Sequence, residues 1–228
     1  MATYEVSEIT KRRLIFAAGE LFSIFGVEGV TVRDIANRAK VKVPLISYHF
    51  GGRDGLIDAV SDLAVERLDC SRITKYMDEN RAKLNVPSER KAFIVGMVRL
   101  LFNTMRAPDR PIWVTPFVLR CALTEGRLRE RMLREAFRPF TNAFFEVYKT
   151  ITGSNDFIET RCWIIRLTHP VILQGMFPNG LKNLYDKSVD QELLFLTLFR
   201  KTLRDALVGL GINDAATDDF SDITLDEP

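Results

Sequence analysis

Apolar residues recur at three- and four-residue spacing along almost all of this 228-residue sequence, and no segment of useful length alternates with the two-residue period of a strand. In the first such segment Leu14, Ala18 and Phe22 form one apolar face of a helix that ends at Gly26. Helices with apolar faces must bury them against one another when no sheet is available. We therefore predict an all-α protein of about nine helices, with a small N-terminal three-helix domain and a larger helical domain.

The apolar fraction of 46% is sufficient for a sizeable core. The three cysteines, Cys70, Cys121 and Cys162, lie in apolar helical patterns and lack the spacing of a metal site or a disulfide framework. No uncharged run reaches the roughly 18 residues of a membrane span, and the N-terminus lacks an apolar signal region. We expect reduced thiols, no metal, no cofactor, no membrane partner and a cytoplasmic protein.

Two short helices joined by a tight turn are predicted near the N-terminus. Thr31-Val-Arg-Asp34 matches a capping box that opens the second helix of the chain. Lys42-Val-Pro44 opens the third helix, because a proline in the first turn has no intrahelical bond to lose. The third helix ends near Phe50, before Gly51-Gly52. This arrangement is typical of a helix-turn-helix.

Charge is distributed unevenly along the chain, although the formal net charge is only +2. Residues 33–53 carry five cations and one acid, a net charge of +4, whereas residues 212–228 carry six acids and no base. A cationic segment suits a polyanion, and an acidic tail suits disorder.

The third helix carries two anchor residues, Ile46 and Phe50, four positions apart on one face. Leu45, Ser47 and Tyr48 then point elsewhere. Two interpretations remain open at this point: a DNA-reading helix, or a small three-helix domain whose exposed face has no function.

The segment from Thr10 to Leu56 resembles, without a gap, the DNA-binding domain of the TetR family of bacterial transcription regulators. The matching residues are Leu14, Ala18, Phe22, Gly26, Thr31, Ile35, Ala36, Ala39, Val41, Tyr48, His49, Phe50, Arg53 and Leu56. The resemblance implies a DNA-binding domain at residues 1–53 and a helical effector-binding and dimerisation domain at 54–213, with a connecting helix at 54–75. The acidic tail at 214–228 is expected to be disordered.

The resemblance and the side-chain chemistry together assign roles in DNA binding. Donors that would contact phosphates and fix the register are Thr31, Tyr48, His49 and Arg53. Candidates for the major groove are Lys40, Lys42, Val43, Leu45 and Ser47. Val43 and Leu45 cannot hydrogen-bond base edges, but they can pack on thymine methyl groups. The alternatives are a surface histidine for His49 and a half-buried packing residue for Tyr48.

Lys40 stands at the turn position that usually holds glycine in the family. A left-handed backbone there would cost about 1 kcal/mol for a lysine, but it would place a cation beside the DNA.

The last helix has two apolar stripes. One contains Leu196, Phe199, Leu203, Ala206 and Leu210, and the other contains Leu193, Leu194, Leu198 and Leu207. A helix that is apolar on two sides is buried between its own domain and something else, for which a symmetric partner is the economical choice. We therefore predict a homodimer through the last two helices, 157–177 and 188–210, as the resemblance also implies. The alternative is a fully internal core helix.

Aromatic residues and isolated cations of the middle helices are the candidates for a ligand site. They are Phe102, Trp113, Phe117, Arg120, Phe140, Phe144, Trp163, Arg166 and His169. Aromatic residues at helical spacing are more often core than ligand contacts. Arg120, Arg166 and His169 would need a partner if buried, and either an internal acid or a ligand anion would supply it.

The sequence lacks the arrangements that catalysis needs, with two histidines, no triad signature and no phosphate-binding glycine loop. We predict a transcription regulator, not an enzyme, whose partners are double-stranded operator DNA, a small-molecule effector and a second copy of the chain. The expected mode is repression relieved by an apolar or amphipathic effector. The alternative is a helical small-molecule-binding protein without DNA-regulatory activity.

Overall fold

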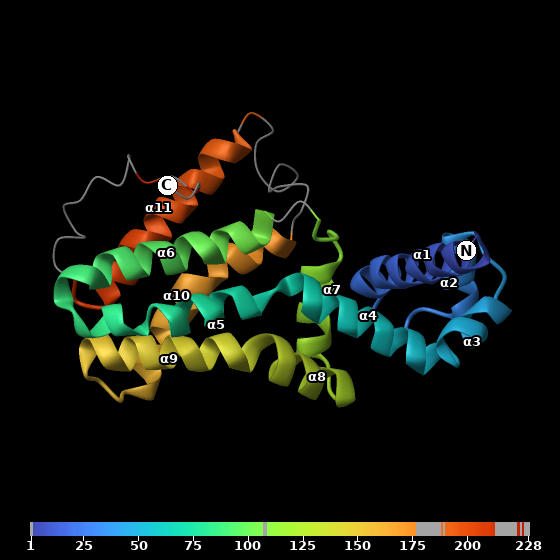
Figure 1. Cartoon of the computed structure of the whole chain (residues 1–228), viewed down its shortest axis with the longest axis horizontal. Coiled ribbons are helices and arrows are strands. Elements are labelled where there is room, and N and C mark those ends of the chain that lie inside the picture. The colour runs from blue at the N-terminus through green and yellow to red at the C-terminus, as the bar shows by residue number, and fades with distance from the viewer. Residues whose placement is uncertain are drawn as a thin grey trace. The chain divides into compact units, whose positions relative to one another are not determined.

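The computed structural model describes residues 2–106, 109–176, 188, 190–212, 223 and 225. These residues form α-helices joined by short turns, and no strand occurs among them (Figure 1). The predicted all-α class is confirmed. Helices are more numerous among the described residues than the predicted nine. The sequence pattern predicts one helix from about residue 53 into the 70s and one over 128–151, but the first is divided at Asp69 and the second at 133–137.

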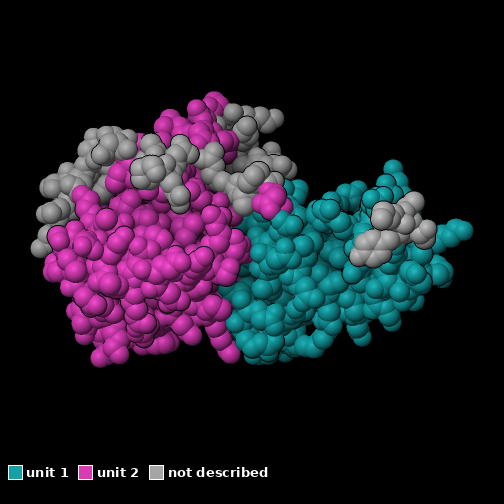
Figure 2. Space-filling model, in the orientation of Figure 1, with its two compact units in different colours: residues 1–68, 110–136 teal, residues 69–109, 137–228 magenta. Residues whose placement is uncertain are grey.

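The chain forms two compact units, coloured separately in Figure 2. Unit 1 comprises residues 1–68 and 110–136, and unit 2 comprises residues 69–109 and 137–228. The predicted DNA-binding domain, 1–53, is therefore only part of a larger compact unit. The functional boundary at 53 stays a prediction, because compactness and function need not share a boundary.

Unit 1 contains the predicted three-helix N-terminal domain and three further helices. Its helices are α1 (Ala2–Phe25), α2 (Val32–Ala39), α3 (Pro44–Phe50), α4 (Arg53–Leu68), α7 (Val114–Leu123) and α8 (Arg127–Met132). The long helix α1 packs against α2, α4 and α7, while α3 and α7 both pack on α4. Helix α1 is thus the central element of the unit.

A glycine allows α7 to approach α1 closely. A Cβ atom on Gly19 would lie 2.5 Å from Cδ2 and Cε2 of Trp113, so only glycine leaves room for the indole ring. One turn further along each helix, the rings of Phe22 and Phe117 stack with centroids 6.3 Å apart. Because Phe22, Phe117 and Trp113 are all buried, this contact forms the core between the two helices.

An arginine network joins α8 to α4. The Arg131 side chain, 18% exposed, forms ion pairs with Asp58 at 3.5 Å, with Asp62, and with Glu135 at 2.9 Å. Hydrogen bonds from Arg134 and Arg131 lower the pKa of Glu135. Three carboxylates thus compensate one half-buried guanidinium and hold α8 on α4.

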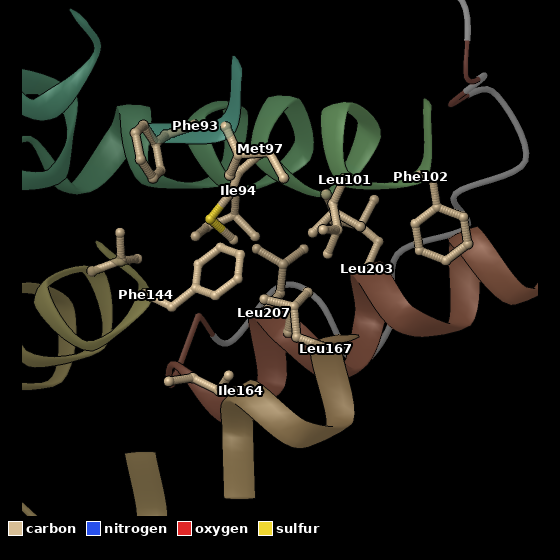
Figure 3. Packing of buried hydrophobic residues seen from close by; sticks show 14 of the residues in the cluster. Phe93, Ile94, Met97, Leu101, Phe102, Phe144, Ile164, Leu167, Leu203 and Leu207 are labelled. Atoms are coloured by element: carbon tan, nitrogen blue, oxygen red, sulfur yellow. The ribbon is translucent and has the colours of Figure 1, made fainter. Parts of the chain in front are cut away.

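Unit 2 is a helical bundle around one apolar core. Its elements are α5 (Cys70–Glu79), the 3-10 helix η1 (Arg81–Asn85), α6 (Pro87–Arg106), α9 (Arg138–Thr152), α10 (Phe157–Met176) and α11 (Gln191–Gly209). A π-helical turn, η2 (Leu133–Phe137), precedes α9. Figure 3 shows side chains of α6, α9, α10 and α11 converging, with Phe102, Phe144, Leu167 and Leu203 among them.

The pattern Ser188-x-x-Gln191 predicts a capping box at the start of α11, and this prediction is wrong. The helix is capped by Asp190, whose Oδ1 accepts hydrogen bonds from the amides of Glu192 and Leu193. The acidic tail lies mostly outside the described residues, so its disorder stays a prediction. Leu225, one of the tail residues that are described, is buried in the unit 2 core, and its carbonyl accepts a hydrogen bond from Asn103.

No helix among the described residues is long and apolar enough to cross a membrane. Likewise, within the described ranges no three acidic, histidine or cysteine side chains are grouped as a metal site would require.

The contact between Gly19 and Trp113 generates a stability prediction. Gly19→Ala should lower the free energy of unfolding by about 1–3 kcal/mol, because the added methyl group overpacks the indole ring. Helix propensity alone predicts the opposite, a gain of about 1 kcal/mol. Urea denaturation followed by circular dichroism measures the difference.

The matched control is the same substitution in a Trp113→Leu background. There Gly19→Ala should be neutral or stabilising, because the clashing ring is gone. An equal loss of stability in both backgrounds would contradict the packing account.

Candidate nucleic-acid interface

The N-terminus of α2 has the predicted capping box. The amide of Asp34 donates to Oγ1 of Thr31 at 3.2 Å, and Oδ2 of Asp34 accepts from the amide and hydroxyl of Thr31 at 2.9 and 2.6 Å. These bonds, that from the Thr31 hydroxyl above all, lower the pKa of Asp34. Because both donors of Thr31 are used in the box, a phosphate here would be met by the first-turn amides of α2.

The turn between α2 and α3 is closed by a lysine in the left-handed conformation. Lys40 has φ 56° and ψ 47°, and its amide donates to the carbonyl of Asn37 at 3.1 Å. The amide of Val41 donates to the carbonyl of Ala36 at 2.9 Å. This helix C-cap geometry favours glycine, so the backbone of Lys40 is strained. The side chain of Lys40 is exposed.

Helix α3 has one anchored face and one exposed face. Ile46 is 2% exposed and holds the helix on the unit, as predicted, while the other predicted anchor, Phe50, is only half-buried. On the outer face Ser47 is exposed and Tyr48 is 78% exposed. The helix ends at Gly51, whose φ of 71° is left-handed.

The remaining groove candidates surround this outer face. Lys42 and Val43 are exposed, and Leu45 and His49 are half-buried. The rings of Tyr48 and His49 meet edge to face with centroids 5.0 Å apart. The half-buried packing proposed as the alternative for Tyr48 is wrong, because the ring is exposed.

Arg53 has a structural contact that the sequence did not reveal. Its guanidinium donates to the carbonyl of Val27 at 2.6 Å, and the carboxylate of Glu28 lies 4.0 Å away. Arg53 therefore supports the turn between α1 and α2. Its contact with a phosphate stays a prediction.

A small concavity lies beside Lys40. It has a volume of about 370 Å³, and Arg13, Arg38 and Lys40 line it. Arg38 is held by Glu20, which accepts from Nε at 2.9 Å and from Nη2 at 2.6 Å. Sequence reasoning missed Arg13, although the basic triplet at residues 11–13 was a visible signal.

The nine predicted ligand residues are divided between the two units. Trp113, Phe117 and Arg120 belong to α7 or its N-cap in unit 1, and the other six belong to unit 2. Phe102, Phe140, Phe144 and Trp163 are core residues of unit 2. The indole N–H of Trp163 donates to the carbonyl of Ala206 at 3.0 Å.

The three polar ligand candidates are all exposed. Arg120 donates to the carbonyl of Ile24 at 2.9 Å, and Arg166 forms an ion pair with Asp205 at 3.3 Å. His169 is also exposed on α10. Because these three side chains are exposed within a single chain, the burial that would make a partner necessary does not occur there, and Arg166 already has an internal acid as its partner.

The predicted dimer seam on α11 also needs correction. Phe199, Leu203 and Leu207 are 0% exposed and belong to the core of their own unit. The large apolar side chains left exposed on these two helices are Phe157, Ile158, Ile165, Leu173 and Met176 on α10, with Leu193 and Val208 on α11. Of these, only Leu193 belongs to a predicted apolar stripe of α11. Phe177 and most of 178–189 lie outside the described residues.

Comparison with known proteins agrees with this geometry. Residues 14–60 match the sequence model of the family described as "Bacterial regulatory proteins, tetR family". Residues 14–60 are therefore a TetR-family segment by sequence similarity. The match covers α2, the left-handed turn and α3. Regulators of this family are not enzymes.

A sequence relative of this TetR-family domain is the HTH-type transcriptional regulator BetI 1 of Chromohalobacter salexigens. It is 41% identical over 51 residues, which are 22% of this chain and 25% of that protein. The chain therefore matches only about a quarter of the length of this relative.

Solved structures show a likeness in fold over most of the chain. A TetR-family regulator from Streptomyces coelicolor has a TM-score of 0.59 with 17% identity, and the alignment covers 90% of this chain and 96% of that one. The hemolysin II regulator HlyIIR has a TM-score of 0.56 with 18% identity, over 86% and 96% of the two chains. At this identity the comparison shows a shared fold.

The strained turn in the TetR-family domain generates the second prediction. Lys40→Gly should raise the free energy of unfolding by about 1 kcal/mol, because glycine adopts the left-handed conformation without a steric penalty. The same variant should bind DNA more weakly, because a cation beside α3 is lost.

Lys40→Ala separates the two effects, because it removes the charge but keeps the left-handed strain. Thermal unfolding should improve only for glycine, and DNA affinity should fall for both variants. A glycine variant no more stable than the alanine variant would show that the turn is not strained.

Proposed function

We propose that this protein is a sequence-specific, DNA-binding transcription regulator that represses its target and is released from an operator by a small apolar or amphipathic effector. The observation that carries the proposal is α3, which Ile46 anchors and which presents Ser47 and Tyr48 outward beside Lys40 and Lys42. A short helix with this anchoring fits the major groove of B-DNA.

Contacts with the DNA backbone come from the ends of the helices in this proposal. Tyr48 and His49 donate to phosphates, and the first-turn amides of α2 face another phosphate. Lys40 and Lys42 add charge that releases counterions from the DNA. These contacts fix the register of the domain and carry no sequence information.

In this proposal, the protein surface that faces the major groove reads the DNA sequence, and this surface is partly apolar. Val43 is exposed and Leu45 is half-buried, so both can meet thymine methyl groups. Ser47 and Lys42 supply the polar contacts, with Lys42 long enough to reach a guanine edge.

The protein acts as a homodimer in this proposal, because an operator with two half-sites is matched by a two-fold symmetric protein. The exposed apolar side chains of α10 follow one line along the helix, with Ile158, Ile165 and Met176 among them. Spacings of seven and eleven residues place them on one face. This face of α10, together with Leu193 and Val208 on α11, is the proposed interface.

The effector contacts proposed are the aromatic residues already identified. Unit 2 concentrates Phe102, Phe140, Phe144 and Trp163 in its core, which suits an apolar ligand. The other predicted aromatic contacts, Trp113 and Phe117, belong to unit 1 and are not part of this proposed site. Release then requires the effector to favour a dimer shape in which the two α3 helices no longer match the operator.

The DNA-binding proposal is tested with Tyr48→Phe. Removing one hydroxyl from this exposed ring should weaken binding to specific and random duplexes alike, by about 2- to 10-fold, because a phosphate contact is lost. Fluorescence anisotropy across a range of salt concentrations measures both affinities.

Leu45→Ala is the matched comparison, because it should reduce only the preference for the specific duplex. The expected loss is about 1 kcal/mol at one thymine position. If the wild-type protein binds neither duplex at low salt, the proposed function is wrong.

The proposed interface is tested with Ile165→Glu. A charge on this exposed position should give monomers with an unchanged fold, because the charge would be desolvated only in the dimer. Light scattering measures the mass and circular dichroism checks the fold.

Leu123→Glu is the control, because Leu123 is also exposed, 86%, but lies on α7 of unit 1. It should leave the dimer intact. Dimers of undiminished stability for Ile165→Glu would remove α10 from the interface.

A further inference from the structure

We propose that unit 1 holds a second small-molecule site, which binds a carboxylate attached to a small apolar body. The site is a concavity of about 420 Å³ formed by the turn after α1, the start of α4 and the turn between α7 and α8. It is distinct from the aromatic core of unit 2, where the effector is proposed to bind. The volume lies in the range typical of ligand pockets.

The floor of this concavity is apolar and buried. Phe22, Ile57 and Cys121 line it, and each is less than 5% exposed. Phe25 also lines it and is 60% exposed, although it is a large aromatic side chain. An exposed phenylalanine beside a buried apolar floor offers a surface that an aromatic or aliphatic ligand body would cover.

The cations at the rim are held by backbone carbonyls. Arg120 donates to the carbonyl of Ile24 at 2.9 Å, and Arg53 donates to the carbonyl of Val27 at 2.6 Å. A carbonyl fixes the position of a guanidinium without neutralising its charge. Both guanidinium groups are therefore positioned at the concavity, and Arg53 also lies 4.0 Å from the carboxylate of Glu28.

Arg120 is the more available of the two arginines. Nη1 of Arg120 lies beside Gly26, 3.4 Å from the place where a Cβ would stand, so the absent side chain leaves the guanidinium room there. Among the described residues no carboxylate lies within 4.0 Å of Arg120. Arg120 also lies near the buried Cys121 of the floor. Burial raises the pKa of that thiol to about 11, and the positive charge of the guanidinium opposes this rise.

Acidic side chains at the rim limit the charge of the anion that can bind. Glu28, Asp54 and Glu125 also line the concavity, and Arg127, the third arginine there, is paired with Asp58 at 3.0 Å. A polyanion would be repelled by three carboxylates. A single carboxylate needs only Arg120 and Arg53, so a monoanion with an apolar body is the class that fits.

The test uses benzoate as the probe and benzamide as its neutral counterpart. Calorimetric titration of the full-length protein gives the affinity, and hydrogen exchange with mass spectrometry locates the site. We expect saturable benzoate binding that protects residues 22–29, 53–57 and 120–128. Benzamide should bind at least ~10-fold more weakly, because it lacks the charge.

Two substitutions of Arg120 are compared with one control substitution of Arg166. Arg120→Gln should weaken benzoate binding about 10-fold, and Arg120→Lys should recover part of the loss because it restores the charge. Arg166→Gln should have no effect, since Arg166 lies on α10 in unit 2. Circular dichroism confirms that each variant is folded.

The proposal is overturned by no saturable benzoate binding up to ~10 mM, by protection confined to unit 2, or by equal affinity for Arg120→Gln and the wild type. The relevance of the site to regulation rests on the proposed function, which is tested separately by measuring DNA binding with no benzoate added. If the protein binds DNA but does not bind benzoate, only this site is rejected. Benzoate binding at these segments without DNA binding rejects only the proposed function.

Discussion

The close approach of α7 to α1 at Gly19 is the constraint on which unit 1 depends. Because residue 19 has no side chain, the indole ring of Trp113 packs directly against the α1 backbone. This contact aligns Phe117 with Phe22 one turn later and leaves Arg120 to bind the carbonyl that ends α1. A helix from the middle of the chain is thereby built into the same compact unit as the proposed DNA-binding helices.

This organisation gives a physical basis for regulation. Helix α1 packs on α2 and α4, and α3 packs on α4, so the position of α3 depends on helices that also contact α7. The ion pairs of Arg131 with Asp58 and Asp62 add a second link, from α8 to α4. A ligand that shifts α7 or α8 would therefore act on the proposed DNA-reading surface through packed side chains and ion pairs.

Sequence patterns predicted local features well. The capping box at Thr31, the anchor at Ile46 and the all-α class follow from short-range rules, and the structure has all three. The sequence did not predict which neighbour covers which helix face, because an apolar pattern carries no information about distant contacts. Leu203, predicted in a dimer seam, lies in the core of its own unit, and Arg120 and Arg166 are exposed. The contacts of Arg53 with Val27 and of Leu225 with the core join residues far apart in the chain, and no local signal marks them.

Selection of genomic DNA fragments by the purified protein, followed by sequencing, tests the central claim most directly. At about 150 mM salt, where non-specific binding is weakened, the account predicts enrichment of a pseudo-palindromic site. Its half-sites should be separated by whole turns of about 34 Å, and thymines should stand at the positions facing Val43 and Leu45. Recovery of fragments in the same proportions as the input DNA would contradict the assignment of this protein as a sequence-specific regulator.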